Sequence, residues 1–121
     1  MTPLLGLPSN PVGIYWESYY GNQSRIINLS QAYNIIFLFH ALPSGSTGSV
    51  VFQRGATTAT LNADIATCRA RGQRCIMTCG GANAQITINS QVTADNFINS
   101  IKAANVAFGG SGTTAAFDGI D

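Results

Sequence analysis

Two carboxylates three residues apart are the residues of this sequence best suited to acid–base chemistry. Asp118 and Asp121 belong to the segment Phe-Asp-Gly-Ile-Asp at residues 117–121. Carboxyl groups that are clustered in one site share protons and titrate together. A second segment, Thr-Cys-Gly-Gly at residues 78–81, joins a hydroxyl residue to paired glycines after an apolar run. Each segment alone also fits an ordinary turn, so the elements that hold them must be considered next.

Four apolar segments are predicted to be buried parallel strands. Each is a run of β-branched or aromatic residues bounded by turn residues, with the near-continuous hydrophobicity of strands that are covered on both faces. They cover residues 12–16, 34–40, 74–79 and 115–121. The two polar segments lie at the C-terminal ends of the last two strands, which is the edge of a parallel sheet that carries function.

Helices are predicted over residues 60–71 and 93–108, with a short helical piece at 30–33. Apolar residues three and four apart give each long helix one stripe to bury. The stripes are Leu61, Ile65 and Cys68 in the first helix and Phe97, Ile98, Ile101 and Ala104 in the second. Gly72 is suited to end the first helix and Thr93 to cap the second.

This alternation of strands and helices implies right-handed crossovers and a parallel sheet. Two architectures fit, a small doubly wound sheet and part of a (β/α)8 barrel, and periodicity does not separate them. The long strand-to-helix connections, residues 41–58 and 82–92, fall on the functional edge in both. No Gly-x-Gly-x-x-Gly follows a strand, and nothing resembles a phosphate-binding lysine loop. Nucleotide binding is therefore disfavoured, which puts an α/β TIM barrel ahead of the doubly wound sheet.

The amino-acid composition argues against some classes of binding partner. Apolar residues make up 45% of the 121 residues and charged residues only 9%, with a net charge of +1. Such a chain is globular, and without a run of Lys or Arg it is not expected to bind nucleic acid. Small uncharged polar residues are typical of proteins outside a cytoplasm, although the start lacks the pattern of a signal peptide. The longest apolar stretch, residues 35–39, is too short for membrane insertion.

Three cysteines and one histidine limit the redox and metal chemistry. Cys75 and Cys79 lie four apart in one predicted strand, which is too far for a disulfide. Cys68 and Cys75 could pair where a helix contacts a strand, but buried free thiols are expected. A zinc site needs further ligands, and His40 is the only histidine. No metal and no cofactor are predicted.

The two polar segments together resemble the signatures of glycoside hydrolase family 18, the chitinase family, in its compact hevamine-like branch. Residues 78–81 resemble the Ser-x-Gly-Gly pattern with Thr for Ser, and residues 118–121 resemble the opening of Asp-Gly-x-Asp-x-Asp-x-Glu. Their order and their spacing of roughly 40 residues suit a (β/α)8 TIM barrel, and the resemblance implies that the chain covers about its first four β/α units. Residues 13–16 (Gly-Ile-Tyr-Trp) look like the first barrel strand and residues 33–39 like the second.

The resemblance implies a retaining, substrate-assisted hydrolysis of β-1,4-linked N-acetylglucosamine polymers. The substrate's acetamido oxygen attacks the anomeric carbon, the motif's third Asp orients the acetamido group, and its Glu protonates the leaving oxygen. Asp121 matches the second Asp, which supports the third, and Asp118, of opposite strand parity, is expected to be structural. The third Asp and the catalytic Glu would follow beyond Asp121. A polypeptide of these residues alone is therefore expected to be inactive and to need the remainder of its own barrel.

Other site residues are assigned by the same resemblance, each with a plainer alternative. The expected substrate-binding residues are Tyr15, Thr78, Gly80, Gly81 and Glu17. Tyr15 could instead belong to the core, and the two glycines could simply form a turn. Glu17 stands where the hevamine-like pattern has Gly, and its plainer alternative is a solvated loop carboxylate.

Four more side chains near the expected site stay open. Tyr19 and Tyr20 could stack on sugar rings or form an exposed loop pair. His40 is expected to be a strand-end residue rather than a catalyst. Trp16, with the opposite parity to Tyr15, is expected to pack beneath a helix.

Three hypotheses are consistent with these observations. The leading hypothesis is a glycan-directed hydrolase, with a lead-in segment at residues 1–11 and the barrel from residue 12 to 121. The alternative is a non-catalytic glycan-binding or structural module on the same fold, for example a virion tail or surface component. The third is a small doubly wound domain complete at 121 residues. The first two imply an extracellular or virion-associated protein whose partner is an N-acetylated polysaccharide.

Overall fold

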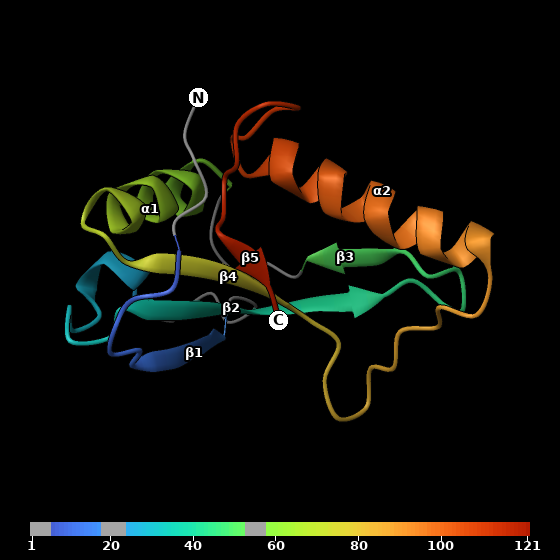
Figure 1. The fold of residues 1–121 in the computed structure, drawn as a ribbon, viewed down its shortest axis with the longest axis horizontal. Helices are drawn as coiled ribbons and strands as arrows, with labels where there is room; N and C mark the ends of the chain where they lie inside the picture. Colours follow the sequence, from blue (N-terminus) through green and yellow to red (C-terminus); the bar gives the residue numbers. More distant parts are fainter. Residues whose placement is uncertain (1–5, 18–23, 53–57) are drawn as a thin grey trace.

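A computed structural model describes residues 6–17, 24–52 and 58–121 of the chain. Figure 1 shows a twisted sheet with two helices above it. In chain order the elements are β1 (Gly13–Glu17), the 3-10 helix η1 (Ile26–Asn28), β2 (Ile35–Pro43), β3 (Val50–Phe52), α1 (Thr58–Ala70), β4 (Arg74–Cys79), α2 (Gln91–Ala107) and β5 (Gly119–Ile120). No helix in the described part of the chain is long and apolar enough to cross a membrane.

The order of the parallel strands decides between the two architectures that the sequence left open. The parallel strands lie in the order β1-β2-β4-β5, so each new strand is added on the same side of the sheet. Both α1 and α2 lie on one face of it (Figure 1). A doubly wound sheet would reverse its strand order and carry helices on both faces. The observed winding is that of a (β/α)8 barrel.

Strand β3 was not predicted from the sequence. It pairs antiparallel with the end of β2 and forms a hairpin within the long connection expected at residues 41–58. The turn of this hairpin packs on α2, where a side chain at Gly48 would place a Cβ 2.1 Å from the Thr93 carbonyl oxygen. Asn96 also donates a hydrogen bond from its side chain to the Thr47 carbonyl. The hairpin thus packs on the N-terminal half of α2, a tertiary contact that strand propensity over three residues does not reveal.

The strand register assigns every side chain of the sheet to one of two faces. Tyr15 of β1 lies opposite Phe37 of β2, which lies opposite Ile76 of β4 and, through it, Gly119 of β5. We call this side, away from the helices, the inner face. Its residues are Tyr15, Glu17, Phe37, Phe39, Ile76, Thr78, Gly119 and Asp121. Residues of opposite parity lie on the helix-covered face.

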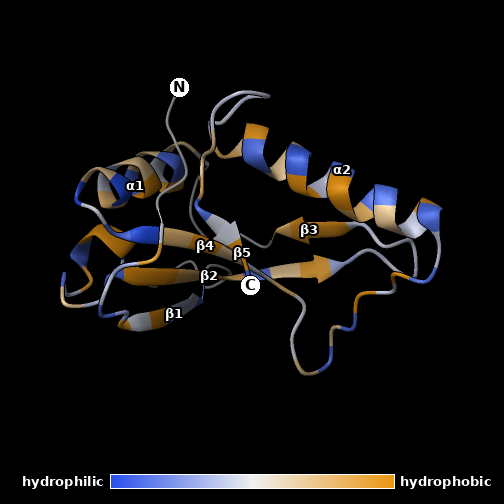
Figure 2. Ribbon diagram, in the orientation of Figure 1, coloured by the Kyte–Doolittle hydropathy of each residue, from blue (hydrophilic) through white to orange (hydrophobic). Residues whose placement is uncertain are grey.

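The core lies between the helix-covered face and the two helices. Figure 2 shows the apolar residues concentrated along β2, β3 and β4, with the helices of mixed character. The cluster includes Ile36, Leu38, Cys75 and Met77 from the strands, Leu61, Ile65 and Cys68 from α1, and Phe108 after α2. The apolar stripe predicted for α1 is confirmed, because all three of its members are buried. Trp16 is buried as expected, and its indole nitrogen donates to the Ser24 carbonyl at 2.8 Å.

The N-cap and the apolar stripe predicted for α2 need correction. Ser90, not Thr93, is the N-cap, and Thr93 completes a capping box with it from the third helical position. The hydroxyls of both residues satisfy backbone N–H groups, so either could have been chosen from sequence. Ile98 is 49% exposed and does not join the buried stripe, whereas Phe97 and Ile101 pack against the core. The short helix is also displaced, from the predicted residues 30–33 to η1.

Two further predictions are confirmed, the glycine that ends the first helix and the free cysteine thiols. Gly72 adopts a φ of +87° just after α1, the left-handed conformation that suits glycine at a helix end. The three cysteines are free thiols, with Cys68 and Cys75 buried and Cys79 partly buried. Cys68 and Cys75 therefore do not pair.

Candidate active site

A carboxylate and two hydroxyl groups converge at the C-terminal ends of β1, β4 and β5. Oδ2 of Asp121 accepts hydrogen bonds from the Tyr15 hydroxyl and from Oγ1 of Thr78, each at 3.0 Å. The backbone of Asp121 is held beside β4, with its N–H donating to Met77 and its carbonyl accepting from Cys79. Three sequence-predicted residues, separated by up to 106 positions, thus meet at one atom. We call Tyr15, Thr78 and Asp121 the carboxylate trio.

Tyr15 reaches Asp121 from an aromatic platform on the inner face. Its ring stacks on Phe37 with centroids 4.6 Å apart, and it meets the edge of Phe39 at 6.2 Å. Tyr15 is 56% exposed, so among the described residues it does not belong to the core, which was the plainer alternative. The hydrogen bond to Asp121, reinforced by desolvation and by the carboxylate charge, raises the pKa of Tyr15 above its ordinary 10.0. The Tyr15 hydroxyl is accordingly a proton-bearing donor at neutral pH.

Thr78 and the paired glycines form the end of β4. Thr78 is buried, so its hydroxyl has little access to water and its hydrogen bond is directed to Asp121. Gly80 has a φ of +85°, and a Cβ there would lie 3.0 Å from the Ala84 carbonyl oxygen. Gly81 has a φ of +146° and lies over the ring of Phe39. The glycines therefore make the sharp turn that takes the chain away from the trio, and substrate contact by them stays a prediction.

Glu17 lies at the same edge but outside the trio. It is exposed at the end of β1, where it lines one side of a cavity of about 440 Å³ together with Tyr15 and Phe39. His40, stacked on Phe39 with ring centroids 3.7 Å apart, is partly buried, and burial lowers its pKa against the opposing effect of Glu17. Substrate binding by Glu17 stays a prediction. The expected stacking pair at residues 19 and 20 lies outside the described residues.

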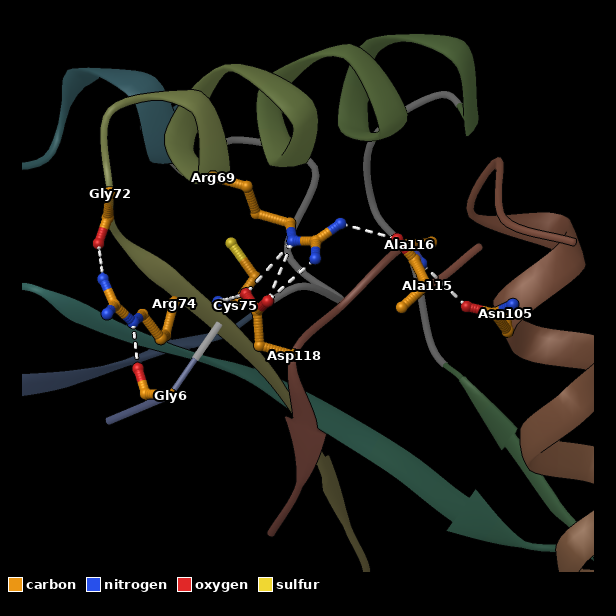
Figure 3. A network of polar contacts seen from close by, with 9 residues as sticks. All are labelled: Gly6, Arg69, Gly72, Arg74, Cys75, Asn105, Ala115, Ala116 and Asp118. Atoms are coloured by element: carbon orange, nitrogen blue, oxygen red, sulfur yellow. Dashed lines mark hydrogen bonds and ion pairs between the residues drawn. The ribbon is translucent and has the colours of Figure 1, made fainter. Parts of the chain in front are cut away.

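Asp118 is directed away from this site. Its carboxylate lies on the helix-covered face, fully buried, and forms an ion pair with Arg69 of α1 at 2.8 Å. Figure 3 shows Arg69 extending from the helix to this carboxylate. The geometry agrees with the structural role expected for Asp118. Sequence analysis missed Arg69 as its partner, although an arginine in the last turn of a helix ahead of a buried strand was an available signal.

The trio by itself orients a carboxylate and does not supply acid catalysis. Two hydroxyl donors on Oδ2 hold the Asp121 carboxylate in place and leave its Oδ1 available to a further group. Within the described ranges no three His, Cys, Asp or Glu side chains are grouped closely enough to hold a metal ion. What the arrangement can do is present a fixed negative charge at the C-terminal edge of a parallel sheet. That edge is where (β/α)8 enzymes bind their substrates.

Comparison with known proteins relates the chain to chitinases. It is 28% identical over 109 residues to chitinase Chi52 of Paenibacillus xylanexedens, a match over 87% of this chain and 21% of that protein. The solved structure of chitinase A from Streptomyces coelicolor superposes with a TM-score of 0.76 and 28% identity, over 92% of this chain and 38% of that one. A family GH18 chitinase from Chromobacterium violaceum superposes with a TM-score of 0.81 and 23% identity, over 98% of this chain and 31% of that one. No family model matches the chain.

These relatives are considerably longer than the chain. The chain spans 21% of the curated relative and 31% to 38% of the two solved structures. The superpositions confirm the predicted fold class, part of a (β/α)8 barrel, and agree with the strand order described above.

Proposed function

We propose, from the premise that the chain is a homologue of the family 18 chitinases, that it forms part of a chitin-directed glycosidase. The observation that carries the proposal is the convergence of Tyr15 and Thr78 on one oxygen of Asp121. These are the positions at which the sequence resembles the family's first strand, its Ser-x-Gly-Gly pattern and the second Asp of its catalytic motif. A resemblance in sequence order alone would not require the three to touch.

The proposed reaction is a retaining hydrolysis of β-1,4-linked N-acetylglucosamine polymers. The acetamido oxygen of the substrate attacks the anomeric carbon, the glycosidic C–O bond breaks, and a Glu in the continuation of the motif gives its proton to the leaving oxygen. Water then opens the cyclic intermediate from the face that the leaving group left, which restores the original configuration. The reaction takes place outside the cytoplasm, where such polymers are found.

In this proposal the trio assists the reaction indirectly, through the next carboxylate of the motif. Asp121, held in place by two hydroxyl donors, would face the next carboxylate of the motif and share a proton with it. That neighbouring carboxylate can then orient and polarise the acetamido group when the substrate binds. Tyr15, with its phenol in front of the aromatic platform, would lie beneath the reacting sugar. These roles rest on the family resemblance and on the contacts of Asp121.

The test is hydrolysis of a chromogenic chitobioside by the full-length protein, with the first product followed by proton NMR. A β-configured first product supports the proposal, and an α-configured one contradicts the retaining mechanism. Asp121→Asn should lower kcat by about 10- to 100-fold, since a misaligned acetamido group loses the advantage of positioning. The matched control is Asp95→Asn, a change to an exposed carboxylate on α2 that bonds only to the Gln91 side chain. A polypeptide of residues 1–121 alone should release no product.

The same experiment separates the alternative function. A full-length protein that binds chitin oligosaccharides but releases no product would be a non-catalytic glycan-binding module. Replacing the fourth residue after Asp121 gives the sharpest distinction. If that residue is Glu, its change to Gln should abolish turnover and keep binding. If it is not Glu, the hydrolase proposal fails.

A further inference from the structure

Residue Asp118 ties the start of β5 to two other elements at once. Its Oδ1 and Oδ2 accept hydrogen bonds from Nε of Arg69, both at 3.1 Å, and Oδ1 accepts a further one from Nη2 at 2.8 Å. Oδ2 also accepts from the backbone N–H of Cys75 at 3.0 Å, and the N–H of Asp118 donates to the Cys75 carbonyl at 2.7 Å. Asp118 thus bonds both backbone groups of one β4 residue while it binds a side chain from α1.

Arg69 extends the same network into the segment that precedes β5. Its Nη1 donates to the Ala115 carbonyl at 2.6 Å, as Figure 3 shows. The next residue, Ala116, donates its N–H to the side chain of Asn105 on α2 at 2.8 Å. The Asn105 amide also donates to the carbonyls of Ser111 and Thr114. Side chains from both helices therefore fix the backbone that leads into β5, which explains why residues 115–118 do not extend the strand as predicted.

The strand that this network holds is short. The β5 ladder pairs Gly119 with Ile76 and Ile120 with Met77, and the backbone of Asp121 continues it with hydrogen bonds to Met77 and Cys79. The network adds side-chain bonds that hold this register from the other end of the segment. A slip of one residue would turn Asp121 to the opposite face, and a slip of two would move it by roughly 6.6 Å along the strand. Either change would remove its carboxylate from Tyr15 and Thr78, whose hydroxyls lie 3.0 Å away.

We propose that Arg69, which lies outside both sequence motifs, is a positioning residue for the active site, acting through Asp118 to hold Asp121 against Tyr15 and Thr78. The pair is well suited to this role because both side chains are buried, 8% exposed for Arg69 and fully enclosed for Asp118. A forked guanidinium that contacts both oxygens fixes an orientation as well as a distance. The inference rests on the proposed function for its effect on turnover, but its geometric part does not.

The test uses Arg69→Lys in the full-length protein. Lysine keeps the charge but offers a point donor, so it cannot contact both Asp118 oxygens and the Ala115 carbonyl in the same geometry. Two readouts are followed in the folded variant: kcat and KM on a chitin oligosaccharide, and the titration of Tyr15 by NMR of ¹³C-labelled tyrosine. We expect kcat to fall by about tenfold or more with KM changed less than about twofold. The pKa of Tyr15 should move down toward its ordinary value, because Asp121 no longer accepts a hydrogen bond from the Tyr15 hydroxyl.

The matched control is a second Arg–Asp pair, whose carboxylate lies on the same helix as Arg69. Arg25 donates through Nε to Oδ2 of Asp64 at 3.0 Å, and the Asp64 side chain on α1 is 4% exposed. This pair joins α1 to the residue before η1 and has no bond to β5. Arg25→Lys should lower the melting temperature and leave both the Tyr15 titration and kcat unchanged.

The two arms keep this inference separate from the proposed function. Wild-type protein without chitinase activity would end the proposed function, while the Tyr15 titration would still decide the role of Arg69. If Arg69→Lys only lowers stability, as Arg25→Lys does, and leaves the Tyr15 titration and kcat as in the wild type, the inference is overturned. Should Arg69→Lys fail to fold, the double variant Arg69→Met with Asp118→Asn replaces it, since no unpaired charge is then buried. The same shift in Tyr15 is expected from it, and an unshifted titration overturns the inference.

Discussion

Asp118 and Asp121 are two carboxylates of one short segment with opposite environments. The Asp118 side chain is fully buried on the helix-covered face, with a guanidinium and a backbone N–H as its partners. Asp121 is exposed on the inner face, and two hydroxyls donate to it. Successive side chains of an extended chain point to opposite faces, so two residues three positions apart face opposite ways. The same residue type therefore serves as a structural anchor at one position and as a candidate site group at the other.

The difference extends to the two faces of the sheet. On the helix-covered face, Ile36, Leu38 and Met77 are completely buried by α1 and α2. The inner face instead presents partly exposed aromatic rings, led by Tyr15 and Phe37. One face is thus completed by the described residues, whereas the other has polar groups gathered at its C-terminal edge. The buried core lies on the first face and the candidate site on the second.

The largest expected effect is on stability and distinguishes the two carboxylates directly. Asp118→Ala leaves Arg69 buried without its carboxylate, which should lower the free energy of unfolding by about 3–5 kcal/mol. Asp121→Ala removes an exposed acceptor and should cost no more than about 1.5 kcal/mol. Urea unfolding followed by circular dichroism measures both. Equal losses for the two variants would contradict the division of the sheet into a structural face and a site face.

The cysteine thiols test how completely the helix-covered face is closed. Burial raises the pKa of Cys75 well above its ordinary value and that of Cys79 to about 11. A raised pKa means less thiolate at pH 8, so native Cys79 should react with iodoacetamide about 100-fold more slowly than in unfolded protein. Peptide mass spectrometry with and without urea gives the rates. Rapid alkylation of native Cys75 would show that this face opens.

Substitutions of Thr78 sharpen the comparison on the inner face. Thr78→Val keeps the shape but removes the hydroxyl that donates to Asp121, and we expect kcat to fall by about tenfold. Thr78→Ser keeps one hydroxyl and should change kcat by less than about twofold. Kinetics on a chitin oligosaccharide with the full-length protein distinguish them. A large loss with Ser would mean that the threonine methyl, not the hydroxyl, is what the site requires.

The smallest expected effect is the titration of Tyr15. Its pKa is raised by Asp121, so folding stability from this bond is complete below pH 10.0, the ordinary value, and is lost as the pH rises through the raised pKa. Asp121→Asn removes the carboxylate charge and should lower the Tyr15 pKa toward 10.0. NMR of ¹³C-labelled tyrosine, assigned with Tyr15→Phe, reports the shift. An unchanged pKa in Asp121→Asn would contradict the bond on which the trio depends.

Much of the fold was predictable because local patterns agreed with the tertiary structure. The strand at residues 74–79 and the buried stripe of α1 follow directly from β-branched runs and from apolar residues at helical spacing. The shortened β5 was not predictable, since it depends on Asn105 and Arg69 binding the backbone of residues 115–116. The β3 hairpin was missed for the same reason, because its packing on α2 decides its conformation.

The sequence by itself predicted the candidate site residues and placed Asp118 and Asp121 on opposite faces of their strand. Strand parity separates Asp118 from Asp121, and two motifs in order indicate the family resemblance. Only the tertiary structure decided the single direction of the strand order, the meeting of Tyr15 and Thr78 at one Asp121 oxygen, and the partner of Asp118. The physical reason is the distance along the chain over which each interaction acts. The periodicity of a segment shows only which way its side chains point from their own helix or strand. Register between strands, and the reach of an arginine from a helix to a strand 49 residues away, are set by contacts between elements.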